Sequence, residues 1–100
     1  MSYYEKITKE LIKNFRRYLI EEEKAAATVE KYIRDINVFA DWLGEKELDK
    51  ETVLIYKENL TQNYAPASVN SVLSSLNSFF TFNEWYNLRV KNLKIQKQLF

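Results

Sequence analysis

A run of short polar side chains occupies residues 68–81 and offers hydrogen-bond donors and acceptors without charge. Exposed helix faces normally carry Lys, Glu, Arg and Gln, whereas Ser and Asn weaken helices. Short side chains let a helix backbone approach a surface closely. In a DNA major groove, Asn pairs with adenine edges, and Ser or Thr meets bases or phosphates. The run is Ser68, Asn70, Ser71, Ser74, Ser75, Asn77, Ser78 and Thr81.

This composition favours DNA recognition, and it leaves two alternatives open. One is an uncharged helix–helix interface buried against another protein. The other is a tolerant surface on which the residue types carry no function. DNA recognition and a protein interface each require a binding partner, whereas a tolerant surface requires none.

Thr28, Lys31 and Arg34 form a second candidate group. A helix N-terminus beside cationic side chains attracts a phosphate, because the free N–H groups and the helix dipole both favour an anion. The same residues also have an ordinary structural explanation. Thr28 can cap a helix, while Lys31 can pair with Asp35 and Arg34 with Glu30, each four residues away. The local spacing favours this structural reading over a phosphate site.

Enzymatic chemistry has little support in this chain, which contains neither His nor Cys. Their absence removes the usual transition-metal ligands, the Ser–His and Cys–His nucleophile pairs and the commonest general base. A nucleophilic Tyr would need flanking cations and a proton acceptor, and no such group is evident. We therefore expect no catalytic residues, metal or cofactor.

Charge is balanced in total and uneven along the chain. Fifteen Lys and Arg residues oppose fourteen Asp and Glu residues, but residues 59–83 carry no charge. Residues 45–58 are acidic on balance, whereas residues 85–100 hold Arg89, Lys91, Lys94 and Lys97 and no acid. No apolar run approaches the roughly 20 residues needed to cross a bilayer. These features predict a soluble, cytoplasmic protein with a basic end.

Hydrophobic periodicity predicts four helices in this 100-residue chain, which has one Gly, one Pro and 46% hydrophobic residues. We expect them at residues 8–23, 28–43, 49–63 and 68–85, with Thr8, Thr28, Asp49 and Ser68 as N-caps. Gly44 would close the second helix in the left-handed conformation. The prediction is one all-α, compact four-helix bundle over residues 1–86. Residues 87–100 would be a detachable basic segment without a packing partner in the chain.

Two stretches resemble patterns of a known family. The stretch TVEKYIRDINVFADWL at residues 28–43 resembles the pattern T…Y…L..F..WL of the N-terminal core-binding domain of tyrosine recombinases, the phage integrase family. The stretch SVNSVLSSLNSFF at residues 68–80 resembles the family's pattern T.NR.LSALR.FF, and residues 48–60 resemble the helix between them. The three occur in the family's order, and the resemblance covers about residues 8–85.

The resemblance implies a SAM-like bundle whose second and fourth helices cross the major groove of recombination-site DNA. A separate C-terminal domain of the parent chain would supply the catalytic Tyr, Arg and His residues. The basic segment, with Arg89 and Lys91, would be the linker that wraps the DNA. The family often has Arg or Lys where Ser71 and Asn77 stand here, which predicts weaker phosphate contact from the fourth helix. Carried over by position, the DNA-facing residues are Thr28, Lys31, Arg34, Ser68, Asn70, Ser71, Ser74 and Asn77.

The sequence thus predicts a DNA-binding arm of a site-specific recombinase or integrase, and not an enzyme in itself. Its expected partners are duplex DNA, the catalytic domain of the parent chain and further recombinase copies assembled on DNA, with no membrane. The alternative is a helical protein–protein interaction module that uses the Ser/Asn face of the fourth helix.

Overall fold

Four α-helices and one 3-10 turn follow one another in the computed structural model, which describes residues 5–95. Outside them, the described chain has a single isolated β-bridge, between Glu5 and Leu48. The expectation of an all-α bundle is confirmed. The elements are α1 (Lys9–Glu21), α2 (Ala26–Leu43), α3 (Lys50–Asn63), α4 (Pro66–Phe82) and η1 (Tyr86–Leu88).

Three of the helix ends lie where local side-chain chemistry places them. The Thr8 hydroxyl accepts the Leu11 N–H at 3.1 Å, and the Asp49 carboxylate accepts the Thr52 N–H at 2.8 Å. Each bond satisfies one of the free N–H groups of a first turn. Gly44 ends α2 with φ +52°, a conformation that costs an L-residue strain and glycine little.

The predicted caps of the other two helices are wrong. Helix α2 begins at Ala26 and α4 at Pro66, so Thr28 and Ser68 lie inside the first turns. Ala25 and Ala65 occupy the cap positions without any side-chain hydrogen bond. Pro66 takes the first helical position, where its fixed φ suits the helix and its missing N–H costs nothing.

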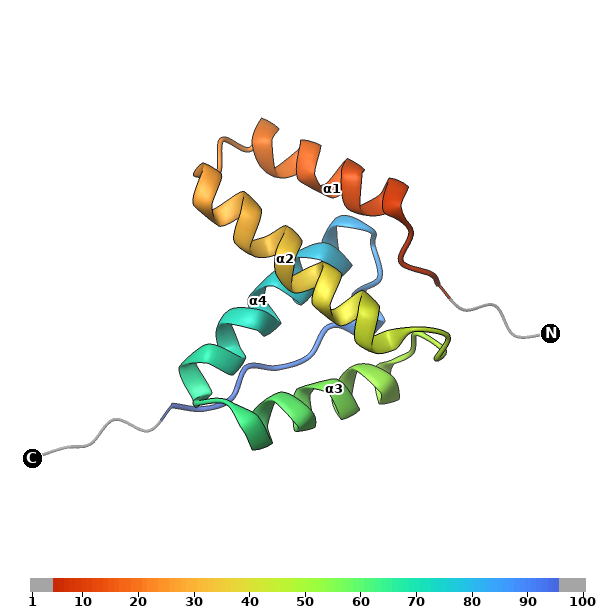
Figure 1. The fold of residues 1–100 in the computed structure, drawn as a ribbon, viewed down its shortest axis with the longest axis vertical. Helices are drawn as coiled ribbons and strands as arrows, with labels where there is room; N and C mark the ends of the chain where they lie inside the picture. The colour runs from red at the N-terminus through yellow and green to blue at the C-terminus, as the bar shows by residue number, and fades with distance from the viewer. Residues whose placement is uncertain (1–4, 96–100) are drawn as a thin grey trace, which may run out of the picture.

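Helix α4 lies at the centre of the packing. It packs against α2 and α3, while α1 packs against α2. In Figure 1, α2 crosses in front of α4, and α1 and α3 lie on opposite sides of this crossing. The core is aromatic: the Phe15 ring of α1 meets Phe79 of α4 edge-on at 5.3 Å, and Phe39 of α2 meets Tyr56 of α3 at 4.8 Å. Leu54 of α3 is 45% exposed, although its neighbour Val53 is fully buried.

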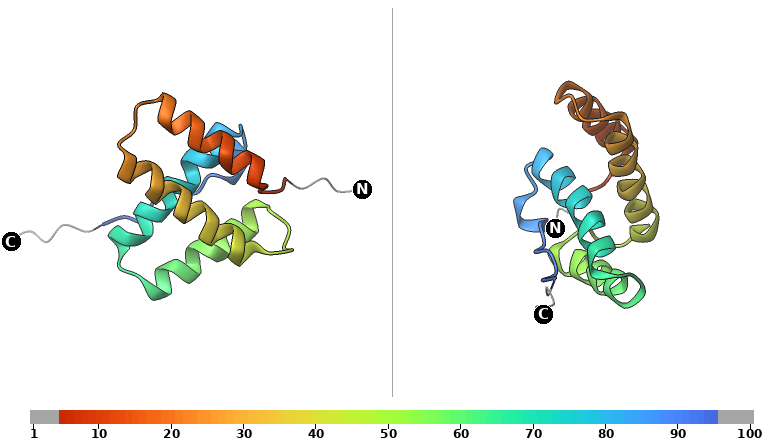
Figure 2. Two further views of the ribbon diagram at one scale, coloured as in Figure 1. Left: turned by 45° about the horizontal axis from the view of Figure 1, so that its top comes forward. Right: turned by 90° about the vertical axis from the view of Figure 1, so that its left-hand side faces the viewer.

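The chain after α4 packs back onto the bundle. Trp85, Leu88 and Val90 belong to the buried core, and Leu93 packs against it. Figure 2 shows this segment running along α4, on the side away from α2. The expectation that residues from 87 onward lack a packing partner is therefore wrong as far as Leu93. Of the basic residues in this segment, Lys97 lies outside the described residues.

No helix in the described part of the chain is long and apolar enough to cross a membrane.

Candidate nucleic-acid interface

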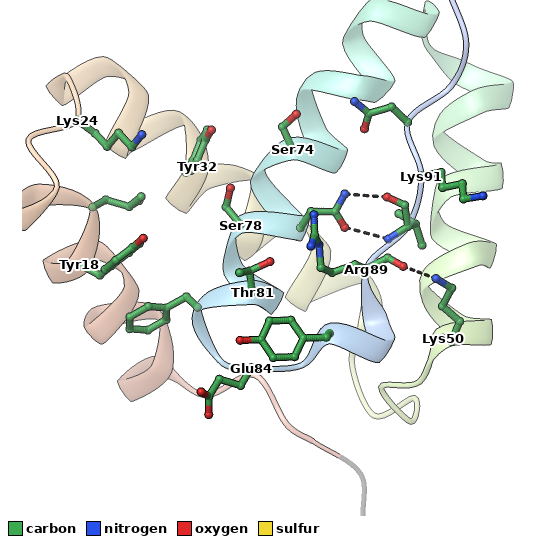
Figure 3. Close-up of a pocket in the computed structure, with 16 residues that line it drawn as sticks. Tyr18, Lys24, Tyr32, Lys50, Ser74, Ser78, Thr81, Glu84, Arg89 and Lys91 are labelled. Atoms are coloured by element: carbon green, nitrogen blue, oxygen red, sulfur yellow. Dashed lines mark hydrogen bonds between the residues drawn. The ribbon is translucent and has the colours of Figure 1, made fainter.

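An open groove of about 1090 Å³ runs along the exposed side of α4. We call it the α4 groove. Its floor is formed by Ser74, Asn77, Ser78 and Thr81, which share one side of the helix at steps of three and four residues. Tyr18, Lys24 and Tyr32, from α1, the α1–α2 turn and α2, line one wall. Lys50 of α3 and the segment after η1, with Arg89 and Lys91, line the other wall, as Figure 3 shows.

The groove is electropositive. Four cationic residues line it, Lys24, Lys50, Arg89 and Lys91, and the acidic residue among the lining is Glu84. A concave surface lined by one sign of charge concentrates its electric field and attracts ions of the opposite sign. The uncharged floor between the two cationic walls thus suits a polyanion.

A smaller hollow of about 350 Å³ adjoins the groove between α2 and α4. It shares Tyr32 and Ser74 with the groove and brings together four of the residues predicted from the sequence. These are Thr28, Lys31, Ser71 and Ser74.

The Lys31 ammonium makes its hydrogen bonds and its ion pair within the protein. Its Nζ donates to the Ser71 carbonyl at 2.6 Å and the Ser75 hydroxyl at 3.2 Å, and it pairs with the Asp35 carboxylate at 2.8 Å. The fully buried Ser75 in turn donates to Asp35 at 2.7 Å. A lysine ammonium has three N–H donors, so these contacts use all of them. In this arrangement Lys31 joins α2 to α4, and Asp35 offsets its charge.

Asn70 and Asn77 are likewise engaged within the chain. The Asn77 amide donates to the Val90 carbonyl at 2.8 Å and accepts the Val90 N–H at 2.9 Å. The Asn70 amide makes the same pair of bonds with Leu93, at 2.9 and 2.7 Å. Reading an adenine edge requires both the oxygen and the nitrogen of the amide, and here both are occupied.

Two residues predicted from the sequence stand apart from both hollows. Arg34 and Ser68 are exposed and line neither of them. The structure thus gathers Thr28, Lys31, Ser71 and Ser74 in the smaller hollow, and Ser74, Asn77, Arg89 and Lys91 in the α4 groove.

The structure also adds lining residues that the sequence did not single out. Lys24 and Tyr32 reach the groove because α1 and α2 pack together, and Lys50 reaches it because the segment after η1 lies beside α3. Lys50 stands in the acidic first turn of α3, where nothing local distinguishes it. Lys24 directly follows Glu23, whose φ of +58° marks the sharp turn out of α1.

Metal binding finds no support in the described chain. Among residues 5–95, no group of three acidic side chains lies close enough together to hold an ion. Apart from the Glu84 carboxylate, the polar groups of the groove are hydroxyls, amides and cations, which are ligands for an anion.

Comparisons with known proteins match the sequence of this chain to one family. The family model for the phage integrase N-terminal SAM-like domain matches residues 12–87. The chain is also 29% identical over 86 residues to the tyrosine recombinase XerC of Treponema denticola. That alignment covers 73% of this chain and 28% of the relative, so the chain spans less than a third of the relative's length. No solved structure gives a significant match. Because the family model covers most of the chain, the chain belongs to the N-terminal SAM-like domains of the phage integrases, the tyrosine recombinase family.

Proposed function

We propose that this domain grips recombination-site duplex DNA with α2, α4 and the basic segment after η1. The observation that carries the proposal is the α4 groove, whose uncharged hydroxyl floor lies between two cationic walls. Family membership points to DNA as the polyanion, and the relative named a tyrosine recombinase agrees with it.

The shape of the groove favours the sugar–phosphate backbone as the part of DNA that enters it. Ser74, Ser78 and Thr81 can donate their hydroxyl hydrogens to phosphate oxygens, which positions a protein on the duplex without reading sequence. Lys24, Arg89 and Lys91 then neutralise phosphates on either side, releasing counterions. Thr28 and Ser71 extend the hydroxyl surface into the smaller hollow. Arg34 and Ser68 lie outside both hollows, so they would contact DNA only where the duplex extends past the hollows.

The parent protein, in this proposal, is a recombinase that cleaves and rejoins DNA through a catalytic domain following this one. A pattern of Arg, then His-x-x-Arg, then Tyr in the parent gene beyond residue 100 would support this assignment. A parent sequence without such a pattern would contradict it.

A salt titration on a mixed-sequence DNA duplex tests the proposed binding of the DNA backbone. The logarithm of the binding constant falls with the logarithm of salt concentration, with a slope of about −0.9 per neutralised phosphate. Replacing Lys24, Arg89 and Lys91 together by Ala should therefore weaken binding on every sequence and flatten the slope by about two to three.

Lys9, Lys13 and Arg17 of α1 give a matched control, since they are exposed and line neither hollow. Their triple replacement by Ala removes the same charge and should flatten the slope much less. Equal effects of the two triple variants would show general charge attraction and overturn the groove as the site. Backbone amide shifts at Ser74, Ser78 and Thr81 on adding duplex should accompany binding. Self-association through this face without any DNA-dependent shift would favour the protein-interaction module instead.

A further inference from the structure

We call residues Arg89–Leu93 the docked segment. Asparagine side chains of α4 hold it to the bundle by bonding to its backbone, as a neighbouring strand does in a sheet. Each of Asn70 and Asn77 exchanges two hydrogen bonds with one backbone residue, as paired residues of antiparallel strands do. Asn77 pairs with Val90 and Asn70 with Leu93, so the docked segment runs antiparallel to α4.

The spacing of these contacts follows from helix and chain geometry. Asn70 and Asn77 are seven residues apart, which is about two helical turns and about 10.5 Å along the axis. Val90 and Leu93 are three residues apart, which is about 10 Å in an extended chain. The two repeats match, so both amides reach the backbone at once.

Lysines of α3 hold the other edge of the docked segment. Lys50 donates to the Arg89 carbonyl, and Lys57 donates to the Lys91 carbonyl at 2.5 Å. These two lysines are also seven residues apart. The carbonyls of residues 89 and 91 therefore bond to α3, while those of Val90 and Leu93 bond to α4.

This arrangement determines where two cations lie. Val90 is buried and Leu93 is half-buried, whereas Arg89 and Lys91 are exposed and line the α4 groove. The Asn77 amide bonds to the backbone of Val90, which lies between these two residues in the chain. Figure 3 shows Arg89 and Lys91 on this segment, beside the floor of the groove. A segment released from α4 would leave both side chains on a free chain, and binding would then have to order them.

We propose that Asn70 and Asn77 are positioning residues that hold Arg89 and Lys91 on the wall of the α4 groove, where they meet DNA phosphates. The role rests on the proposed function. Asn70 is the more informative of the two, because it lines neither hollow and acts on the groove only through the docked segment.

Hydrogen exchange in the complete chain, without DNA, tests the docking by itself. Asn70→Ala should expose the Leu93 amide, and Asn77→Ala the Val90 amide, with exchange about tenfold faster at each. Asn83→Ala is the matched control, because the side-chain amide of Asn83, the C-cap of α4, donates to the Phe79 carbonyl and not to the docked segment. Helicity and unfolding midpoint are recorded for each variant. Unchanged exchange at Val90 and Leu93 overturns the docking.

A double-mutant cycle with a mixed-sequence duplex tests the positioning role. Asn70→Ala should weaken binding about threefold or more when Arg89 and Lys91 are present. In a chain that already carries Arg89→Ala and Lys91→Ala, the same change should have no effect on affinity. A purely structural role would give the same loss in both backgrounds, and that result overturns the positioning role. If the unaltered chain binds no duplex, the proposed function and this role both fail, while the exchange result on docking stands.

Discussion

At the residue scale, the polar residues of α4 have two different uses. Ser75, Asn70 and Asn77 bond within the protein, whereas Ser74, Ser78 and Thr81 remain on the floor of the groove. The unusual composition of α4 therefore combines internal connections with an external surface. Lys31, which the family resemblance places among the DNA-facing residues, is part of the internal set and pairs with Asp35, as their spacing of four residues predicts.

Replacing Lys31 by Met should accordingly lower stability more than DNA binding. The change keeps the aliphatic stem but leaves the nearly buried Asp35 carboxylate, whose side chain is 11% exposed, without its ion-pair partner. We expect unfolding to become easier by about 1–3 kcal/mol, measured by urea titration. Duplex affinity should fall less than for Arg89→Ala. Lys13→Met on exposed α1 provides the baseline, within about 0.5 kcal/mol of the unaltered chain. A Lys31→Met chain of normal stability would disprove the internal role.

At the element scale, each helix begins for a reason that can be tested separately. Helix α3 depends on Asp49, whose pKa is lowered because its carboxylate accepts hydrogen bonds from Thr52, first of all from the backbone N–H. Helices α2 and α4 begin without any side-chain cap. Among the N-caps of the four α-helices, Asp49 is the one with an ionisable side chain.

The Asp49 cap predicts a loss of stability in acid. Because the folded pKa lies below the unfolded value of about 3.9, the carboxylate stabilises the fold above that pH. The contribution is lost as the pH falls through the folded pKa. Asp49→Asn should therefore be less stable than the unaltered chain at pH 7, with the difference shrinking below about pH 4. Urea unfolding at neutral and acidic pH measures this. Glu51→Gln, in the same first turn, is the control, and an unchanged difference across the pH range would rule the mechanism out.

Local signals account for what could be predicted from the sequence, and long-range pairing for what could not. Thr8, Asp49 and Gly44 act on their own turns, so the ends they specify are readable in the chain. The sequence predicts Ser68 as the cap of the fourth helix, although Pro66 already begins α4. The burial of Ser75 depends on Asp35, forty residues earlier, and the docking of Leu93 depends on Asn70, twenty-three residues earlier. Nothing in the local spacing marks Asp35 as the partner of Ser75, or Asn70 as the partner of Leu93. The walls of the α4 groove depend on such long-range contacts, so they could not be predicted from the sequence.

At the scale of the whole molecule, the folded unit extends beyond the fourth helix. Leu88 is 2% exposed and Val90 6%, and both belong to the same core as α4. The family match ends at residue 87, just before these two residues. The boundary of the folded unit in this chain is therefore better placed after Leu93 than at residue 86.

A chain shortened after Asn87 tests whether the folded unit extends to Leu93. Losing Leu88 and Val90 exposes the core beneath them, and burying a side chain of this kind contributes about 1.5–3 kcal/mol. We expect the free energy of unfolding of the shortened chain to fall by at least about 3 kcal/mol. Its melting temperature, measured by circular dichroism, should be clearly lower. A chain shortened after Ile95 keeps the docked segment and should melt like the unaltered chain. Identical melting of both shortened chains would return the boundary to residue 86.

The antiparallel course of the docked segment has a mechanical consequence for anything joined after it. Because Leu93 bonds to Asn70, a tether to the proposed catalytic domain would start near the beginning of α4 and not where α4 ends. Docking of residues 89–93 shortens the free tether by five residues, or about 17 Å of reach. A shorter tether raises the effective concentration of the two domains around one stretch of DNA, provided that it still spans the gap. In the proposed parent chain, Asn70 and Asn77 would thus set the length of the free tether between this domain and the catalytic domain.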